Sequence, residues 1–337
     1  MFQVIAMWNL SRPHEEMKNI VEKVELRGYN PETFLTGEFT NKIANKEIKP
    51  LSVSNIADKY CPTRRDLYFY KGINRLSRRG QQKTWGIEAG NVVEDYIKRV
   101  FKSKNIKTNA YESLIKRGNN IYEEFVEEKR SSLKRLKSLE QSSLGAKEGD
   151  TDWLLTLLNN NGRAELSIRI LHSLLKENGF LDSDHIKITE QLHPNPRQIG
   201  ISLGIKPDFI VPEFAIVGDI KSGVEFKDHF QLTCTGYALA YENEKGKGND
   251  INWGIIYFFP TRNPSWYVRP LTFAQIYIFP IDDYLRQWFL DIRDEAYSII
   301  SQKEPPDFPP EDQRENCKYC KFKNHCINEG LELENSE

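Results

Sequence analysis

Two runs of β-branched and aromatic residues, separated by a short break that contains proline, most constrain how this chain can fold. Both runs lie within residues 203–223. This pattern predicts a β-hairpin. If Val211 faces Ile216 across a four-residue loop, the antiparallel register sets Asp208 directly opposite Asp219, because each acid lies three residues outward from that pair.

The predicted hairpin gathers three charged side chains on one face of the sheet. Opposed residues have Cβ atoms roughly 4.5–5.5 Å apart, and Lys221 shares the face of Asp219 because it lies two residues further on. Two carboxylates this close repel each other, so one would take up a proton unless a cation lies beside them. Mg²⁺ and Mn²⁺ prefer such oxygen ligands. An ammonium group beside the ion can orient a metal-bound water or neutralise charge on a phosphate, so the hairpin predicts half of a phosphodiesterase site.

The spelling of this segment resembles the PD-(D/E)-x-K pattern of nucleases. It reads Pro207-Asp208, ten residues, and then Asp219-Ile220-Lys221. Such short strings also arise by chance, and the alternative is a surface hairpin whose polar face is only solvated. Apolar periodicity predicts a strand over 186–192 before the hairpin, then a helix over 231–242, a strand over 253–259 and a helix over 281–302. This order is typical of an α/β (α+β) fold with helices packed on a mixed sheet.

The charge of the chain excludes one general mode of nucleic-acid binding. Its 337 residues have a formal net charge of −1, so no overall positive field attracts nucleic acid and any binding must come from local patches. The apolar N-terminal ten residues lack a basic leader and suit neither a signal peptide nor a membrane span. We therefore expect a cytoplasmic protein with no membrane partner.

One local patch lies within residues 61–83, where basic and aromatic side chains alternate. The basic members are Arg64, Arg65, Lys71, Arg75, Arg78, Arg79 and Lys83, and the aromatic members are Tyr68, Phe69 and Tyr70. Basic groups that follow a phosphate backbone, together with rings on which bases stack, suit single-stranded nucleic acid. A solvated helix face whose aromatic residues turn toward the core fits the same pattern equally well.

A further acid lies on an amphipathic helix predicted over 84–101. Glu94 follows Gly90 by one turn, so the two share a face on which the missing side chain lets another backbone approach. Glu94 is therefore a candidate metal ligand, and an ordinary surface glutamate is the alternative. Further along, a loop over 145–152 and two separate helices over 153–159 and 164–176 are predicted.

Four of the five cysteines form a candidate metal site. Three lie close together as C-x-x-C-x5-C, namely Cys317, Cys320 and Cys326. In a reducing compartment such spacing indicates metal ligands rather than disulfides. Cys61 is the candidate fourth ligand, His325 competes with it for a zinc site, and Cys234 is predicted to be a buried core thiol. Zinc and iron-sulfur clusters both accept four thiolates, so the spacing leaves both open.

Together these features resemble the CRISPR-associated RecB-like exonucleases that carry an iron-sulfur cluster, the Cas-four family, and in particular its longer archaeal subtype I-A branch. The resemblance extends over nearly the whole chain. The matching segments are Glu25-Leu26-Arg27-Gly28-Tyr29-Asn30, Tyr60-Cys61-Pro62-Thr63-Arg64-Arg65-Asp66, the acid-rich helix at 90–95, Pro207-Asp208, Asp219-Ile220-Lys221, Thr235-Gly236-Tyr237-Ala238-Leu239-Ala240 and the three clustered cysteines.

The resemblance implies a restriction-endonuclease-like, RecB-like nuclease core and a function. Members are metal-dependent DNases that trim DNA ends, often prefer single strands, and help to prepare spacer precursors for the CRISPR integrase. By similarity Asp208 and Asp219 would bind Mg²⁺ or Mn²⁺, and Lys221 would be the catalytic lysine, with Tyr237 beside it. The cysteines would hold a [4Fe-4S] or, less often, a [2Fe-2S] cluster, with zinc as the alternative; these are Cys61, Cys317, Cys320 and Cys326.

The implied domain organisation has four parts, and the oligomeric state stays open. The parts are an N-terminal extension (1–50), a mainly helical part with Cys61 and the first active-site helix (51–185), a RecB-like nuclease core (186–303) and a cysteine-rich module that closes onto Cys61 (304–337).

Two departures from the family pattern matter. Aligned on Gly90, Glu94 takes the place of a histidine found in many relatives, although a carboxylate is also a sensible ligand for Mg²⁺ or Mn²⁺. Relatives tend to have a glutamine four residues before the tyrosine, whereas Gln231 precedes Tyr237 by six, roughly 120° apart on a helix.

The alternatives to a DNA exonuclease are a non-catalytic DNA-binding scaffold subunit of the adaptation complex and a RecB-like repair nuclease outside CRISPR.

Overall fold

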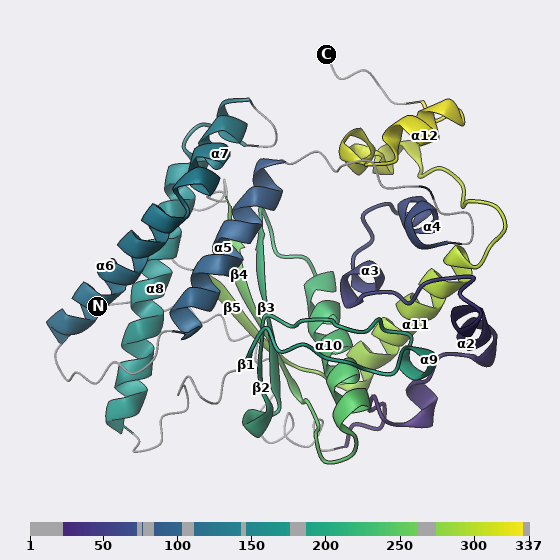
Figure 1. Ribbon diagram of the computed structural model, residues 1–337, viewed down its shortest axis with the longest axis horizontal. Helices are drawn as coiled ribbons and strands as arrows, with labels where there is room; N and C mark the ends of the chain where they lie inside the picture. Colours follow the sequence, from purple (N-terminus) through teal and green to yellow (C-terminus); the bar gives the residue numbers. More distant parts are fainter. Residues whose placement is uncertain are drawn as a thin grey trace.

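The computed structural model describes residues 23–72, 76, 84–102, 111–142, 146–175, 187–261 and 274–332. A five-stranded sheet in the order β1-β2-β3-β4-β5 lies at its centre (Figure 1). The strands are β1 (Lys187–Ile188), β2 (Phe209–Val211), β3 (Ile216–Gly223), β4 (Trp253–Pro260) and β5 (Gln275–Pro280). Only β3 and β4 pair in parallel, while the other neighbours are antiparallel, so the sheet is mixed as predicted.

The central hairpin has the predicted register. Val211 pairs with Ile216 and Phe209 with Gly218, and one further step sets Asp208 opposite Asp219. The loop is a short 3-10 turn over Pro212–Phe214. Proline fits the first position of such a turn because its fixed φ suits it and its missing N–H is not needed there.

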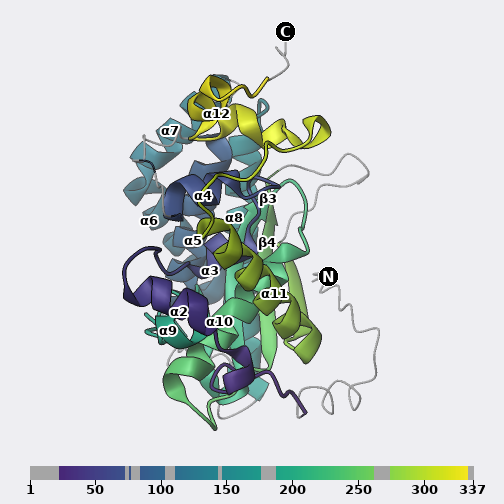
Figure 2. The ribbon, with the colours of Figure 1, turned by 90° about the vertical axis from the view of Figure 1, so that its right-hand side faces the viewer.

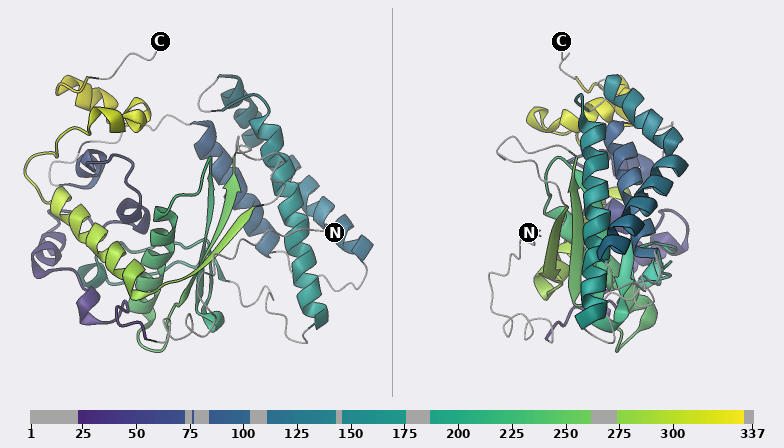
Figure 3. Two further views of the ribbon diagram at one scale, coloured as in Figure 1. Left: turned by 180° about the vertical axis from the view of Figure 1, so that it is seen from behind. Right: turned by 90° about the vertical axis from the view of Figure 1, so that its left-hand side faces the viewer.

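Helices cover both faces of the sheet (Figure 1; Figure 3). One face carries α10 (His229–Lys245), which connects β3 to β4, and α11 (Asp283–Ile300), with the short α2 (Gly37–Ala44), α3 (Val53–Ala57) and α9 (Pro196–Ile199) beside them. The other face carries α5 (Trp85–Lys102), α6 (Tyr111–Glu128), α7 (Arg130–Gln141) and α8 (Asp150–Leu175). Two apolar cores result, because side chains of one strand alternate: Val217 packs toward α10, and Ile220 packs toward α5.

A third, smaller core joins the end of the chain to an early helix. It contains Tyr68 and Phe69 of α4 (Arg65–Lys71). It also contains Phe322 and Leu331 of the C-terminal segment 304–332, which we call the tail. The tail comprises two 3-10 turns, Glu311–Gln313 and Glu315–Tyr319, followed by α12 (Lys323–Asn328). Figure 2 shows the tail lying against α4.

A buried ion network ties the first described residues to the α10 layer. Glu242 of α10 receives two hydrogen bonds from Arg286 at 2.7 and 2.9 Å, one from Arg27 at 3.0 Å and one from the Gly28 N–H at 2.8 Å. A Cβ on Gly28 would lie 1.9 Å from the Leu239 carbonyl oxygen, so only glycine lets the backbone approach this closely. The Arg27-Gly28 motif therefore has a structural role at this contact.

Two predicted elements differ from the structure. The loop predicted over 145–152 ends earlier, because α8 begins at Asp150. In place of the two helices predicted over 153–159 and 164–176, α8 is one continuous helix. Gly162 lies between the two predicted helices and is a packing residue of α8: a Cβ there would lie 2.1 Å from Tyr96 Oη of α5. The strand predicted over 186–192 shrinks to β1 because Thr189 has φ of 53° and interrupts it.

Other predictions agree closely, and one segment was missed. The helices α5, α10 and α11 and the strand β4 lie where periodicity predicted them, whereas β5 was not predicted. In the described part of the chain, no helix combines the length and apolar character that crossing a membrane requires.

Candidate functional site

Charged side chains from the hairpin and from α5 meet at one site. Asp208 directly precedes β2, and the Ile220 N–H of β3 donates to Asp208 Oδ2 at 2.7 Å, which fixes that carboxyl beside Asp219. Helix α5 passes close to β3 at this level, since a Cβ on Gly90 would lie 3.1 Å from Ser222 Oγ. The close backbone approach at Gly90 brings the next turns of α5 to the hairpin.

Two lysines pair with the three acids of this site. Lys221 Nζ lies 2.6 Å from Asp219 Oδ2. Lys98 Nζ lies 2.7 Å from Asp208 Oδ1 and also pairs with Glu94, one turn earlier on α5. The predicted residues Glu94, Asp208, Asp219 and Lys221 thus come together, and Lys98 joins them.

The electrostatics of the site reflect burial and close charges. Burial raises the pKa of Asp219 to about 7, with a contribution from the Asp208 carboxylate and opposition from the Lys221 ammonium. Burial works against the charged forms of Lys98 and Lys221, but the adjacent carboxylates outweigh it and raise the pKa of both lysines. Both ammonium groups therefore stay charged at neutral pH, while Asp219 lies near its midpoint.

Tyr237 of α10 faces the same group of acids. Burial raises the pKa of its phenol well above the usual value, and the charges of Asp219 and Asp208 add to that shift. Cys234 lies one turn earlier on α10. Burial raises the pKa of its thiol well above the usual value, and the charges of Asp219 and Asp208 add to that shift. Cys234 is thus a core thiol, as predicted, and it forms part of the wall behind the acids.

The two aspartates have carboxylate oxygens that suit a divalent ion. Asp219 Oδ2 is buried and receives no well-aligned hydrogen bond from the described residues, although the Lys221 ammonium lies close. A buried carboxylate oxygen with an incomplete set of partners is a suitable ligand for a hard cation. Within the described ranges, no three Asp, Glu, His or Cys side chains are already arranged around a common metal position. The donor set therefore fits one ion at the two aspartates, with ammonium groups on either side.

The four predicted cysteine ligands line a second site, between α4 and the tail. Cys61, Cys317, Cys320 and Cys326 border one cavity together with apolar side chains that include Phe322 and Leu331. Burial raises the pKa of the Cys317 and Cys326 thiols, and it raises the pKa of Cys320 to about 11. Four thiols around one cavity form the donor set that zinc and iron-sulfur clusters accept, so these residues fit such a group.

Polar contacts hold the two halves of the cysteine cavity together. Tyr60 Oη donates to the Asn316 carbonyl at 3.1 Å, and Asn316 Nδ2 donates to the Tyr60 carbonyl at 3.0 Å. Arg65 pairs with Glu329 and donates to the Pro306 carbonyl. These contacts bring Cys61 to the tail, although more than 250 residues separate them in the sequence.

His325, the alternative zinc ligand, does not border the cysteine cavity. Its Nε2 lies 3.1 Å from Glu329 Oε1, and its ring packs edge-on against Phe69 with centroids 4.6 Å apart. Cys61 borders the cavity instead. The arrangement favours the four-cysteine donor set over the one with histidine.

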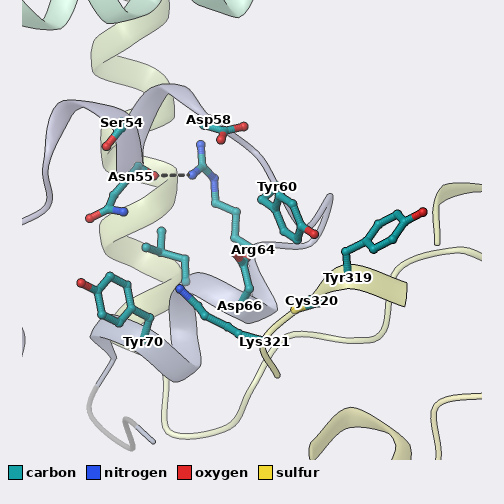
Figure 4. Close-up of a pocket in the computed structure, with 11 residues that line it drawn as sticks. Ser54, Asn55, Asp58, Tyr60, Arg64, Asp66, Tyr70, Tyr319, Cys320 and Lys321 are labelled. Carbon is teal, nitrogen blue, oxygen red and sulfur yellow. Dashed lines mark hydrogen bonds between the residues drawn. The ribbon is translucent and has the colours of Figure 1, made fainter. Parts of the chain in front are cut away.

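A polar cavity of about 200 Å³ adjoins the cysteine cavity and shares Cys320 with it (Figure 4). Its lining holds two basic residues, Arg64 and Lys321, and two acids, Asp58 and Asp66. Three tyrosines supply aromatic rings, namely Tyr60, Tyr70 and Tyr319. Arg64 is fixed by hydrogen bonds to the Asn55 and Ile56 carbonyls at 3.0 and 2.7 Å. Asp58, which borders this cavity, lies 4.0 Å from His229 Nε2 of α10.

The basic and aromatic patch is largely structural where the structure describes it. Tyr68 and Phe69 are buried, as the alternative with aromatic residues turned toward the core predicted. Arg64 and Arg65 are also buried, so the solvated basic face that this alternative included is not present at these two residues. Tyr70 borders the polar cavity instead. The remaining basic members, Arg75, Arg78, Arg79 and Lys83, lie outside the described residues.

Lys98 is the site residue that the sequence analysis missed. Its four-residue spacing from Glu94 was a signal for an ion pair on α5. The contact with Asp208 depends on how α5 docks on the hairpin, which no local pattern reveals.

One comparison identifies similar proteins. A family model described as "CRISPR-associated exonuclease Csa1" matches residues 1–329. No curated protein and no solved structure matches the chain. The matched range includes the hairpin, α5, α10 and all four cysteines of the cavity.

Proposed function

Because the chain belongs to the CRISPR-associated exonuclease Csa1 family, we propose that its acids form a divalent-metal-dependent active site that hydrolyses DNA from its ends. The observation that carries this proposal is that two buried aspartates lie side by side at the central hairpin, with Lys221 paired to Asp219. Asp208 and Asp219 would hold one Mg²⁺ or Mn²⁺, with Glu94 nearby. When bound, such an ion supplies Lewis acidity and lowers the pKa of a coordinated water.

The residues of this chain would then act as follows. Lys221, held at 2.6 Å from Asp219, orients the attacking water and neutralises charge that builds on the phosphate oxygens. The water oxygen forms the new bond to phosphorus, the ester oxygen leaves, and one proton passes from the water to the leaving side. Tyr237, whose phenol stays protonated because of burial and the nearby carboxylates, is a hydrogen-bond donor for the phosphate.

The cysteine cavity supports a second part of the proposal. Cys61, Cys317, Cys320 and Cys326 would hold a [4Fe-4S] cluster, with [2Fe-2S] or zinc as the alternatives. The apolar lining and the links between α4 and the tail suit a group that stabilises the closed chain. Analysis of the purified protein for iron, sulfide and zinc tests this part. Four iron and four sulfide per chain would support the larger cluster, and one tightly bound zinc without iron would contradict it.

The proposed substrate is DNA with a single-stranded or frayed end, within CRISPR adaptation. The cavity beside the cysteines offers tyrosine rings on which bases could stack, although its acids Asp58 and Asp66 balance the charge of Arg64 and Lys321. Trimming of spacer precursors for the integrase subunits follows from the CRISPR association of the family. A repair role outside CRISPR is disfavoured by the same association.

A non-catalytic DNA-binding subunit is the second candidate, and one observation favours it. Lys98 already pairs with both Asp208 and Glu94, so these acids have a partner without any metal. DNA binding combined with complete inactivity in Mg²⁺ and in Mn²⁺ would support this candidate over the first.

The substitution Lys221→Ala tests the catalytic proposal. We expect it to lower divalent-dependent degradation of end-labelled DNA by about 10²–10³-fold, because it removes charge stabilisation at the reacting phosphate. Folding and bound iron should be unchanged. Lys134→Ala, at an exposed position of α7, is the matched control and should digest DNA like the unmodified protein. Undiminished digestion by Lys221→Ala would reject the proposed site.

A further inference from the structure

Lys98 is unusually buried for a lysine and has a defined position. Only 12% of its side chain is exposed, and the side chain of its partner Asp208 is 11% exposed. Lysines are almost never this buried unless they are paired. Here the ammonium lies against two carboxylates at once, Asp208 Oδ1 at 2.7 Å and Glu94.

The hydrogen bonds of the two aspartates divide the site into two sides. Asp208 has a partner on each oxygen, since Oδ2 accepts from the Ile220 N–H and Oδ1 contacts Lys98. Asp219 Oδ2 has the Lys221 ammonium 2.6 Å away, and the Lys221 side chain is 28% exposed. Both sides of the site thus carry an ammonium group, but the one beside Asp219 is partly exposed and pairs with one carboxylate, whereas Lys98 is more buried and lies between two, Asp208 and Glu94. A metal ion can therefore enter more readily on the Asp219 side.

The charge balance of the site also favours a single ion. With all groups ionised, Glu94, Asp208 and Asp219 contribute −3, and Lys98 and Lys221 contribute +2, so the five side chains sum to −1. One divalent ion brings the sum to +1, which a phosphodiester at −1 neutralises. A second ion, roughly 3.5–4 Å from the first as in two-metal sites, would bring the sum to +3 with Lys98 in place, or to +2 if it displaced Lys98.

We propose that the Lys98 ammonium takes the place of a second metal ion, so that this active site holds one divalent ion and one fixed lysine cation. The inference rests on the proposed metal-dependent function. Lys98 is then a positioning residue: it fixes Asp208 and Glu94 and excludes a second ion. A phosphate bound beside Asp219 would be stabilised by the metal ion on that side and by the positive charge of the Lys98 ammonium on the other.

The test counts Mn²⁺ bound by the full chain. Calorimetric titration gives the stoichiometry, and electron paramagnetic resonance distinguishes an isolated ion from an exchange-coupled pair. We expect one isolated Mn²⁺ in the unmodified protein and two coupled ions in Lys98→Met, which removes the charge but keeps an unbranched stem. Lys98→Arg keeps the charge and should bind one ion. Lys102→Met, at an exposed position one turn further along α5, is the matched control and should also bind one.

The outcomes separate this inference from the function on which it rests. Two coupled ions in the unmodified protein, or a single ion in a folded Lys98→Met, would overturn the role of Lys98 and leave a metal-dependent nuclease intact. If the unmodified protein binds no Mn²⁺, or if the bound Mn²⁺ is retained in Asp219→Asn, both the role of Lys98 and the proposed metal-dependent function are overturned. If Lys98→Met fails to fold, the count in the unmodified protein still decides, because two coupled ions there contradict the proposal.

Discussion

Asp219 links the pH of the solution to metal binding at the scale of a single residue. It is buried, faces Asp208 and pairs with the Lys221 ammonium. These surroundings favour a proton on the carboxyl in the absence of a metal, because burial disfavours the charged form. A bound ion competes with that proton, so binding releases it.

We therefore expect the affinity for Mn²⁺ to fall as the pH decreases below about 7, the pKa to which Asp219 is raised. A proton that must leave before the ion binds weakens the affinity by about tenfold per pH unit in that range. Titrations between pH 5.5 and 8 measure this slope. In Asp219→Asn the remaining affinity should no longer show the step, and a pH-independent affinity in the unmodified protein would contradict the assignment.

At the scale of elements, α5 and α8 are held together by a glycine contact. Gly162 of α8 meets Tyr96 of α5, and no Cβ fits between them without movement of the ring. Helix α5 carries Glu94 and Lys98, so its position against the hairpin determines the geometry of the acids. Packing at Gly162 thus supports the site from a distance.

The substitution Gly162→Ala should lower the free energy of unfolding by about 1–3 kcal/mol, because it forces an overpacked contact. Gly86→Ala, also in a helix but with open space around its Cβ, is the matched control. It should leave stability unchanged or raise it by up to about 1 kcal/mol. Denaturant unfolding of both variants measures the difference, and equal effects would show that the contact with Tyr96 carries no energy.

Elements that follow from local pattern were predictable, and those that depend on docking were not. The register of Asp208 and Asp219 follows from loop length and the two-residue period of a strand, and it is present as predicted. The continuity of α8 depends on the contact of Gly162 with Tyr96, which is remote in the sequence. Lys98 reaches Asp208 for the same kind of reason. The sequence pattern therefore identified the pair of Lys221 with Asp219 but neither of the two pairs that Lys98 makes.

At the scale of the whole molecule, the cysteine cavity closes the chain. Cys61 precedes α4, whereas the other three cysteines lie in the tail, and the contacts of Tyr60 and Arg65 cross the same boundary. The core between α4 and the tail is small, so a bound group would add much of its stability.

Replacing Cys61 by alanine should therefore destabilise more than the tail. We expect loss of the bound metal and a decrease in the melting temperature of the main unfolding transition of about 5 °C or more, because binding energy at a closed site is folding energy. Cys234→Ala, which is remote from this cavity, should keep its full metal content. A Cys61→Ala protein whose main transition is unchanged, with only the tail cleaved by protease, would contradict this expectation.

The central claim is that Asp208, Asp219 and Lys221 surround one catalytic cation. A crystal grown with Mn²⁺ and examined by anomalous scattering tests it most directly. The account predicts one strong peak about 2.0–2.2 Å from an oxygen of each aspartate, with Lys221 beside it and Lys98 still paired with Glu94. A map with no peak between the two aspartates, in crystals whose protein degrades DNA in Mn²⁺, would contradict it.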